Sequence, residues 1–318
     1  MRALRLGPHG PLLDTAFSGR PRPGEARLGL RLGGVCATDL ELVKGYMGFE
    51  GVLGHEFVAE VLESPDPSLV GQRVVGEINV PCRACATCRT GGTTHCPTRT
   101  VLGISGRDGA FSDEFWLPAS NLHVVPGAVP DEAAVFVEPL AAACRIVEQV
   151  HVRPADRVVV LGLGRLGQLC ARVLALTGAD VSGVARSSAK LDLLPPWIRA
   201  LPASQAVELA GADVVVDCTG SPDGLATATR LVRPGGTLVM KTTVHDLGPA
   251  SPTAWVVDEV TLVGSRCGPF APALRLLAAG LVDPTPLITA TLPLESGLDA
   301  LERAREPGGL KVLLDARG

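Results

Sequence analysis

The sequence lacks the features that define several large classes of protein. No stretch approaches about 18 consecutive apolar residues, so neither a transmembrane helix nor a membrane partner is expected. No run of lysine and arginine is present, and 29 basic against 33 acidic residues give a net charge of −4. This balance argues against nucleic acid as a partner. Internal repeats and low-complexity tracts are also missing.

The first residues, MRALRLGPHGPLLD, lack the apolar core and small-residue cleavage site of a secretory signal. We therefore expect a cytoplasmic protein, in a reducing compartment where structural disulfides are rare. The chain nevertheless has nine cysteines. An odd number fits metal ligands and buried thiols better than a full set of disulfide pairs.

The 318 residues are enough for two domains with separate cores. Up to about residue 140 the pattern predicts short strands between turns; the candidates are Arg27–Leu32, Phe57–Glu63, Gln72–Ile78 and Glu114–Leu117. Strand and helix signals then alternate, which predicts a doubly wound α/β sheet with one strand short or missing in 186–211. The closing residues predict a helix and an edge strand. We assign 1–139 and 269–318 to one domain and 140–268 to the other.

The segment GLGRLG matches the GxGxxG motif, with residues Gly162, Gly164, Arg165, Leu166 and Gly167. It ends a hydrophobic strand and opens an apolar helix, which is the context that dinucleotide binding requires. The glycines permit a tight turn, close approach to a pyrophosphate and close helix–strand packing, and the helix N-terminus favours the phosphates. The alternative is a glycine-rich turn in an unrelated α/β protein, but the alternating pattern continues well beyond it.

The residues that distinguish NAD from NADP lie about 20 positions further on, at the end of the second strand. An NAD enzyme usually has an acidic residue there, and this chain has none. Arg186, Ser187 and Lys190 follow instead. A cation and hydroxyls suit a 2′-phosphate. We therefore favour NADP over NAD; the alternative is a solvated loop.

Four of the nine cysteines lie close together in PCRACATCRTGGTTHC, namely Cys82, Cys85, Cys88 and Cys96. A disulfide, a redox relay, an iron–sulfur cluster and a zinc site are the alternatives. The spacing C-x2-C-x2-C-x7-C has too long a last gap for a ferredoxin-type cluster. Four thiolates can form a closed zinc site without an open position. A structural zinc lobe over 81–97 is therefore favoured.

A second set of candidate ligands is dispersed along the chain. Cys36 lies in GGVCATDLE, His55 in VLGHEFVAEV and Glu138 in FVEPLAAA. Cys36 alone is more readily a buried apolar thiol, and His55 alone a core histidine. Together they form the mixed cysteine, histidine and carboxylate set of a catalytic zinc, which keeps one position for water or substrate.

These motifs together resemble the zinc-dependent medium-chain dehydrogenase/reductase (alcohol dehydrogenase-like) superfamily. GVCATD, GHE, the four cysteines, EPL, GLGRLG and RPGGTLV occur in that family's order over essentially the whole chain. The resemblance implies a GroES-like, mostly-β catalytic domain and a Rossmann dinucleotide-binding domain. EPL resembles the polyol, sugar and threonine dehydrogenase branch, and CATDLE is similar to glucose dehydrogenases of that branch, which often use NADP.

The resemblance also implies roles for single residues. Cys36 and His55 would hold the catalytic zinc, with Glu56 or Glu138 as the third protein ligand. Asp39 would orient a ligand from behind.

Three further positions follow from the same resemblance. Thr38 would contact the substrate oxygen, and its hydroxyl would pass the proton towards Glu41. Lys311 matches a basic position that can reach the pyrophosphate; the alternative is a solvated lysine on an edge strand. Lys241 stands where a glycine is common, close to the expected nicotinamide.

The leading hypothesis is a zinc-dependent oxidoreductase that transfers a hydride between NADP(H) and a secondary alcohol or ketone, such as a sugar or polyol. The alternatives are a primary-alcohol or aldehyde reductase of the same superfamily, and a non-catalytic NADPH-binding protein. We expect two zinc ions per chain, one catalytic and one structural. Family analogy implies a homodimer or homotetramer.

Overall fold

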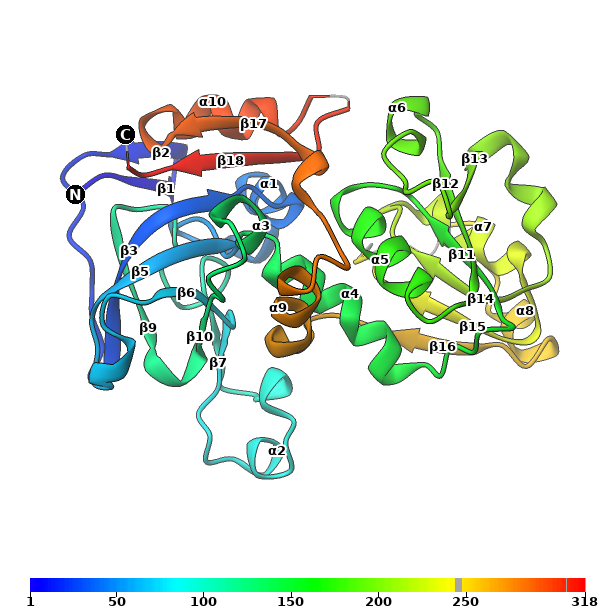
Figure 1. Ribbon diagram of the computed structural model, residues 1–318, viewed down its shortest axis with the longest axis horizontal. Helices are drawn as coiled ribbons and strands as arrows, with labels where there is room; N and C mark the ends of the chain where they lie inside the picture. Colours follow the sequence, from blue (N-terminus) through cyan, green and yellow to red (C-terminus); the bar gives the residue numbers. More distant parts are fainter. Residues whose placement is uncertain (244–247, 307, 318) are drawn as a thin grey trace. The chain divides into compact units, whose positions relative to one another are not determined.

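The computed structural model describes residues 1–243, 248–306 and 308–317, which form two compact units (Figure 1). The first unit comprises Met1–Glu138 and Phe270–Gly318, and the second comprises Pro139–Pro269. The chain therefore leaves the first unit once and later returns to it. The break lies near the start of helix α4, Val137–Gln149.

The first unit is built mainly from antiparallel strands, as predicted. Its largest sheet has the order β10-β6-β5-β3-β18-β17, with β9 also paired to β3. These strands are β3 Glu25–Gly34, β5 Phe57–Glu63, β6 Arg73–Gly76, β9 Glu114–Pro118, β10 Leu122–Val124, β17 Ile288–Pro293 and β18 Lys311–Asp315. Smaller sheets join β1 Ala3–Gly7, β2 Gly10–Asp14 and β4 Gly51–Val52, and pair β7 Asn79–Val80 with β8 Thr100–Val101. Short helices complete it: α1 Ala37–Val43, α2 Ala86–Arg89, α3 Asp131–Ala134, α9 Phe270–Ala278 and α10 Gly297–Arg303.

Alternating side chains explain why the central strand forms. Along β3, Ala26, Leu28, Leu30 and Leu32 are buried, whereas the residues between them are half-buried. This period of two allows one face of a strand to enter the core. The four strands predicted in this region correspond to β3, β5, β6 and β9.

The predicted edge strand is wrong. The segment after α10 forms β18, which lies inside the sheet between β3 and β17. The edge belongs to β17, which the sequence analysis missed because its residues alternate only between half-buried and exposed. β17 and β18 are parallel, and α10 lies between them in the chain. The chain crosses over through α10 from the edge strand β17 to the hydrophobic strand β18, which thereby lies inside the sheet.

The second unit is the predicted doubly wound sheet. Its parallel strands have the order β13-β12-β11-β14-β15-β16, in which the two halves diverge from β11 and β14. The strands are β11 Arg157–Leu161, β12 Asp180–Ala185, β13 Arg199–Pro202, β14 Ala212–Asp217, β15 Val232–Met240 and β16 Thr261–Gly264. The helices are α5 Arg165–Ala175, α6 Ser188–Leu191, α7 Pro222–Leu231 and α8 Pro252–Val257. Segment 186–211, where the sequence predicts a short or missing strand, contains the short strand β13. In such a sheet, ligands bind at the carboxyl ends of the strands where the order reverses.

Among the described residues, no helix is long and apolar enough to span a membrane.

Candidate active site and cofactor loop

Two turns of the first unit bring the predicted catalytic-metal residues together. Cys36 immediately precedes α1, and His55 and Glu56 follow one another between β4 and β5. Their ligand atoms all lie within 4.8 Å of one another. His55 and Glu56 are buried, and Cys36 is half-buried. The group can therefore hold a metal ion and still be reached from one side.

Asp39 connects these residues from behind. Its fully buried carboxylate accepts a hydrogen bond from the backbone N–H of Cys36 at 2.8 Å, and another from Gly54 N–H at 3.2 Å. Oδ1 also lies 3.5 Å from Nδ1 of His55. The carboxylate therefore fixes the two turns that carry Cys36 and His55, as expected of a residue that supports metal ligands.

The surroundings of His55 favour a positive charge. Burial lowers the pKa of the ring, but the Asp39 carboxylate and the Cys36 sulfur raise it more, so that the pKa lies well above its usual value. Nδ1 is buried and has no hydrogen-bond partner among the described residues. The His55 imidazole, the Cys36 thiol and the Glu56 carboxylate together form a ligand set that suits a zinc ion.

Lys311 is buried beside the metal group. Its Nζ donates a hydrogen bond to Oε2 of Glu56 and lies 5.3 Å from the centre of the Phe136 ring. The side chains of Lys311 and Glu56 are only 0% and 2% exposed. The alternative of a solvated edge lysine is wrong, because β18 is interior and the ammonium is buried in an ion pair. A contact with the pyrophosphate stays a prediction.

A glycine makes room for this ion pair, and neither feature was foreseen from the sequence. A Cβ atom at Gly34 would lie 2.7 Å from Cγ1 of Val135, 3.0 Å from the Glu56 carboxylate and 3.3 Å from Cδ of Lys311. The sequence signal for this close packing was the glycine Gly34 in the motif GGVCATD. Because a carboxylate has two oxygens, Glu56 can accept from Lys311 and still face a cation.

The other predicted catalytic residues are less closely joined. Glu138 is half-buried at the start of α4 and is not in the group formed by the described ligands Cys36, His55 and Glu56. Oγ1 of Thr38 lies 3.8 Å from the Cys36 sulfur. Glu41 is exposed on α1 and pairs with Lys44 at 2.8 Å. The threonine therefore lies beside the metal group, and the glutamate lies at the surface.

The four cysteines of the lobe converge on one point. The Sγ atoms of Cys85 and Cys88 are 3.4 Å apart, those of Cys82 and Cys96 are 3.6 Å apart, and two further pairs lie 3.9 and 4.0 Å apart. Zn–S bonds of about 2.3 Å in a tetrahedron place the sulfurs about 3.8 Å apart. All nine cysteines are free thiols. The spacing of the sulfurs fits one zinc ion and not a disulfide.

Backbone donors prepare part of this lobe for thiolates. Hydrogen bonds from the N–H groups of Ala84 and Cys85 lower the pKa of Cys82 to about 6. The N–H of Cys82 and the hydroxyl of Thr98 likewise lower the pKa of Cys96, whereas burial raises that of Cys88 to about 12. Zinc binds thiolates and stabilises them. The donor set is therefore consistent with a closed metal site.

The GxGxxG residues adopt the turn that their spacing predicts. Gly162 has a φ of +86°, which favours glycine. A Cβ at Gly167 would lie 1.9 Å from the carbonyl oxygen of Gly162, so α5 can approach β11 only with glycine there. At Gly164, a Cβ would meet no described atom within 4 Å. This position, just before Arg165 and Leu166 open α5, leaves the backbone accessible to a ligand.

Cations gather beside this loop. Arg186 is exposed after β12, and Ser187 and Lys190 are half-buried next to it. Burial and the charges of Arg165 and Arg186 lower the pKa of Lys190. Three basic groups therefore lie near enough to repel one another, which an anion would relieve.

A buried network, not foreseen from the sequence, holds the basic loop on α5. Gln168 donates to the Lys190 carbonyl at 2.6 Å, and Arg172 donates to the Gln168 side chain and the Leu193 carbonyl, both at 2.6 Å. Gln168 is completely buried and Arg172 is 8% exposed. The sequence signal for this network was the spacing of Gln168 and Arg172, four residues apart on a helix, which places them side by side.

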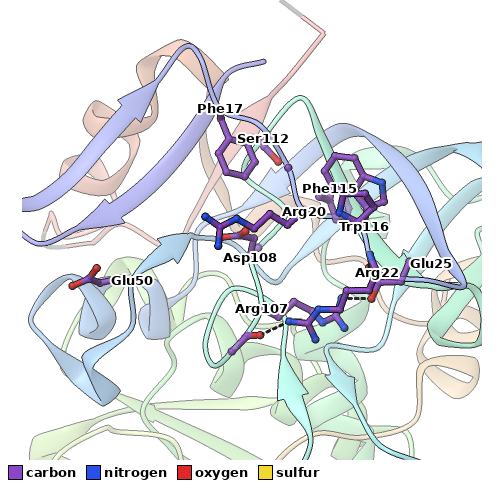
Figure 2. A pocket seen from close by; sticks show the side chains of 14 residues that line it. Phe17, Arg20, Arg22, Glu25, Glu50, Arg107, Asp108, Ser112, Phe115 and Trp116 are labelled. Atoms are coloured by element: carbon purple, nitrogen blue, oxygen red, sulfur yellow. Dashed lines mark hydrogen bonds and ion pairs between the residues drawn. The ribbon is translucent and has the colours of Figure 1, made fainter.

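A surface pocket of about 340 Å³ lies elsewhere in the first unit (Figure 2). Its charged residues largely satisfy one another: Arg107 pairs with Glu25 at 2.6 Å, Arg22 donates to the Gly106 carbonyl, and Asp108 accepts from the Val52 N–H. None of the predicted site residues lines it. The pocket therefore offers no evident reactive group.

Comparisons with known proteins agree with this geometry. Residues 22–127 match the alcohol dehydrogenase GroES-like domain, and residues 166–279 match the zinc-binding dehydrogenase family. A 2-dehydro-3-deoxy-L-galactonate 5-dehydrogenase from Pseudoalteromonas atlantica is 29% identical over 316 residues, covering 93% of this chain and 92% of its own.

Two solved structures cover 99% of this chain with a TM-score of 0.90. One is a zinc-binding dehydrogenase from Sinorhizobium meliloti 1021 bound to NADP, 26% identical and covered over 98% of its length. The other is an alcohol dehydrogenase from Escherichia coli CFT073 complexed with NADH, 25% identical and covered over 99%. The chain belongs to the zinc-dependent medium-chain dehydrogenase/reductase superfamily. It is a zinc-binding oxidoreductase that uses a nicotinamide cofactor.

Proposed function

We propose that this enzyme transfers a hydride between NADP(H) and a secondary alcohol or ketone of a polyhydroxylated substrate, such as a sugar acid or polyol. The observation that carries the proposal is the buried group of Cys36, His55 and Glu56 behind an accessible face. These residues would hold the catalytic zinc, with Glu138 as the alternative carboxylate. The bound ion would act as a Lewis acid that lowers the pKa of an alcohol.

The side chains next to the metal group would orient the substrate and move its proton. Thr38, beside Cys36, would accept the hydroxyl proton of the substrate at Oγ1 as its own hydroxyl proton passes on towards Glu41. Glu41, three residues later on α1 and exposed, would release that proton to solvent. Asp39 would keep the metal ligands in place. The substrate class is supported by the L-galactonate-related dehydrogenase, whose name describes oxidation at carbon 5 of a sugar acid.

The preference for NADP rests on Arg186, Ser187 and Lys190, at the end of β12 where an acidic residue would oppose a phosphate. An Arg186→Ala variant should lose about tenfold or more in NADPH affinity, because a charge-assisted hydrogen bond is lost. NADH affinity should change little. Arg199→Ala, which removes an exposed arginine from β13, is the matched control. Equal wild-type affinities for NADPH and NADH would refute the preference.

A second zinc in the four-cysteine lobe would be structural, because four thiolates leave no position for a substrate. This makes two zinc ions per chain. The free thiols suit the cytoplasmic location that the sequence analysis expects, which stays a prediction.

We also infer a homodimer or homotetramer formed through the second unit. β16 is an edge strand, and the neighbouring α8 exposes Val256 and Val257 by 77% and 73%. A sheet edge beside exposed apolar residues favours pairing with a second copy. Light scattering should give a multiple of the chain mass for the wild type and a smaller species for Val256→Asp/Val257→Asp. Val207→Asp, at an equally exposed apolar site, is the control.

The activity is tested by following NADPH absorbance over sugar acids, polyols, secondary alcohols and aldehydes, in both directions. Polyhydroxylated secondary alcohols or their ketones should give the highest kcat/KM. Cys36→Ala should abolish turnover and leave NADPH binding intact. Turnover with primary alcohols or aldehydes alone would contradict the substrate class, and full activity of Cys36→Ala would contradict the catalytic zinc.

A further inference from the structure

The turn that follows β14, residues 218–221, has no role in the proposed function. β14 ends at Asp217, which lies opposite Leu161, the last residue of β11, in the parallel register. The backbone N–H of Cys218 then donates to the Leu161 carbonyl at 2.8 Å. The turn therefore begins at the carboxyl ends of the two strands where the order of the sheet reverses, and such sheets bind their ligands there.

This turn lies directly against the first glycine of the GxGxxG loop. A Cβ atom at Gly162 would lie 2.8 Å from both the Cα and the backbone N of Thr219, so a larger residue at Gly162 would push the loop and the turn apart. A Cβ at Gly164 would meet no described atom within 4 Å. The loop is thus packed against the turn at Gly162 and open at Gly164. A change in the turn would reach the loop through Gly162.

A buried carboxylate holds the turn in place. Asp217 is 0% exposed, and its Oδ1 accepts hydrogen bonds from the backbone N–H of Thr219 at 2.9 Å and from the Thr219 hydroxyl at 2.7 Å. The same hydroxyl accepts from the N–H of Ser221 at 3.2 Å. Burial raises the pKa of Asp217, and the hydrogen bonds from Thr219 oppose that rise. These bonds compensate for the burial of the carboxylate and at the same time fix the backbone of the turn.

The turn is also held from two other sides. A Cβ at Gly224 in α7 would lie 1.8 Å from Oγ1 of Thr219, so the helix packs closely onto the hydroxyl. Gly220, whose φ is +66°, donates its N–H to Oγ1 of Thr242 at 2.7 Å. Thr219 and Gly220 are nevertheless exposed. An accessible backbone that several hydrogen bonds hold in one conformation is preorganised for a ligand.

We propose that Asp217 and Thr219 are positioning residues for the nicotinamide cofactor. Their hydrogen bonds hold the turn 218–221 against Gly162, and so keep the GxGxxG loop in the conformation that admits a pyrophosphate. Neither side chain needs to touch the cofactor, because the effect passes through the backbone of the turn. This inference rests on the proposed binding of NADP(H) at the loop, and it adds the residues that set the shape of that loop.

Replacing Thr219 by valine tests the inference, because valine keeps the branched shape and removes the hydroxyl. Calorimetry should show NADPH binding weakened about fivefold or more, since binding would then have to order the loop. Thr219→Ser keeps the hydroxyl and should retain most of the affinity. With saturating NADPH, kcat should stay within about twofold of the wild type while KM for NADPH rises. Thr219→Ala serves if Thr219→Val does not fold.

Variants of two other residues make the test specific. Asp217→Asn should also weaken NADPH binding, and Asp217→Asn/Thr219→Val should bind about as weakly as Thr219→Val alone, because both changes act on the same hydrogen bonds. Thr227→Val removes a hydroxyl that donates to the Asp223 carbonyl in α7, and should leave the affinity unchanged.

Several results would overturn the inference. One is a folded Thr219→Val protein with a lower melting temperature but an unchanged dissociation constant for NADPH, which would indicate a merely structural role. Another is a Thr219→Ser protein that loses as much affinity as Thr219→Val. No loss of affinity in Asp217→Asn, or additive losses in the double variant, would likewise contradict a shared positioning role.

The outcomes separate this inference from the proposed function. NADPH and NADH share the pyrophosphate, so Thr219→Val should weaken the binding of both to the same extent, whereas Arg186→Ala should affect NADPH alone. A wild-type protein that binds neither nucleotide would refute the use of NADP(H). Binding of both nucleotides that is insensitive to Thr219 would refute only the positioning role.

Discussion

Replacing Lys311 by methionine should destabilise the first unit strongly. The side chains of Lys311 and Glu56 are 0% and 2% exposed and form an ion pair inside the sheet. Methionine keeps most of the apolar stem that lies against Phe136 but removes the charge. In the zinc-free protein, the Glu56 carboxylate would then remain buried without its cation.

The size of the effect follows from that unpaired charge. Removal of one partner from a buried ion pair costs about 3–5 kcal/mol, most of which is the desolvation of the remaining partner. Replacement of both partners restores much of the loss for the same reason. The double variant Glu56→Gln/Lys311→Met should therefore be more stable than Lys311→Met alone.

Urea unfolding followed by circular dichroism, on protein from which a chelator has removed the zinc, measures these differences. Lys44→Met is the control, because that lysine is exposed and its pair with Glu41 should contribute less than about 1 kcal/mol. A loss of less than 1 kcal/mol for Lys311→Met, or a double variant less stable than the single one, would refute the reasoning.

Three further predictions concern the fold and the lobe. Gly167→Ala should lower stability by about 2 kcal/mol or more, because its Cβ would meet the Gly162 carbonyl, whereas Gly164→Ala should keep its melting temperature and lose cofactor affinity. Burial raises the pKa of Asp131, but its arginine partners lower the pKa by more, so that the folded value lies below the usual 3.8. The ion pairs of Asp131 therefore stabilise the fold above pH 3.8, and this stabilisation is lost as the pH falls through the folded value. In an acid titration, Asp131→Asn should lose less stability than the wild type. Cys85→Ser should release the lobe zinc and increase cleavage by trypsin within 81–97, and an unchanged zinc content would contradict a structural site.

Local patterns were sufficient for much of the fold. The alternation along β3 and the continuous apolar run of β11 predicted their elements, because each pattern matches the side chains that one strand buries. β17 and the interior place of β18 were not predicted. β18 pairs with residues 32–34 of β3, about 280 positions earlier, and β17 pairs with β18; no local period records such contacts.

The candidate site was likewise predicted only in part from the sequence. Cys36, His55 and Glu56 were candidates because their residue types and motifs suggest a metal. The pairing of Glu56 with Lys311 was not visible, because the partners are distant in sequence and a lysine on a strand is usually exposed. The support of the basic loop by Gln168 and Arg172 likewise depends on tertiary packing.

The central claim is a zinc ion held by Cys36 and His55 in addition to the one in the cysteine lobe. Elemental analysis of the purified protein measures this directly. The account predicts two zinc ions per chain in the wild type and one in a folded Cys36→Ala variant. A wild-type protein with a single zinc ion, retained in Cys36→Ala and lost in Cys85→Ser, would contradict it.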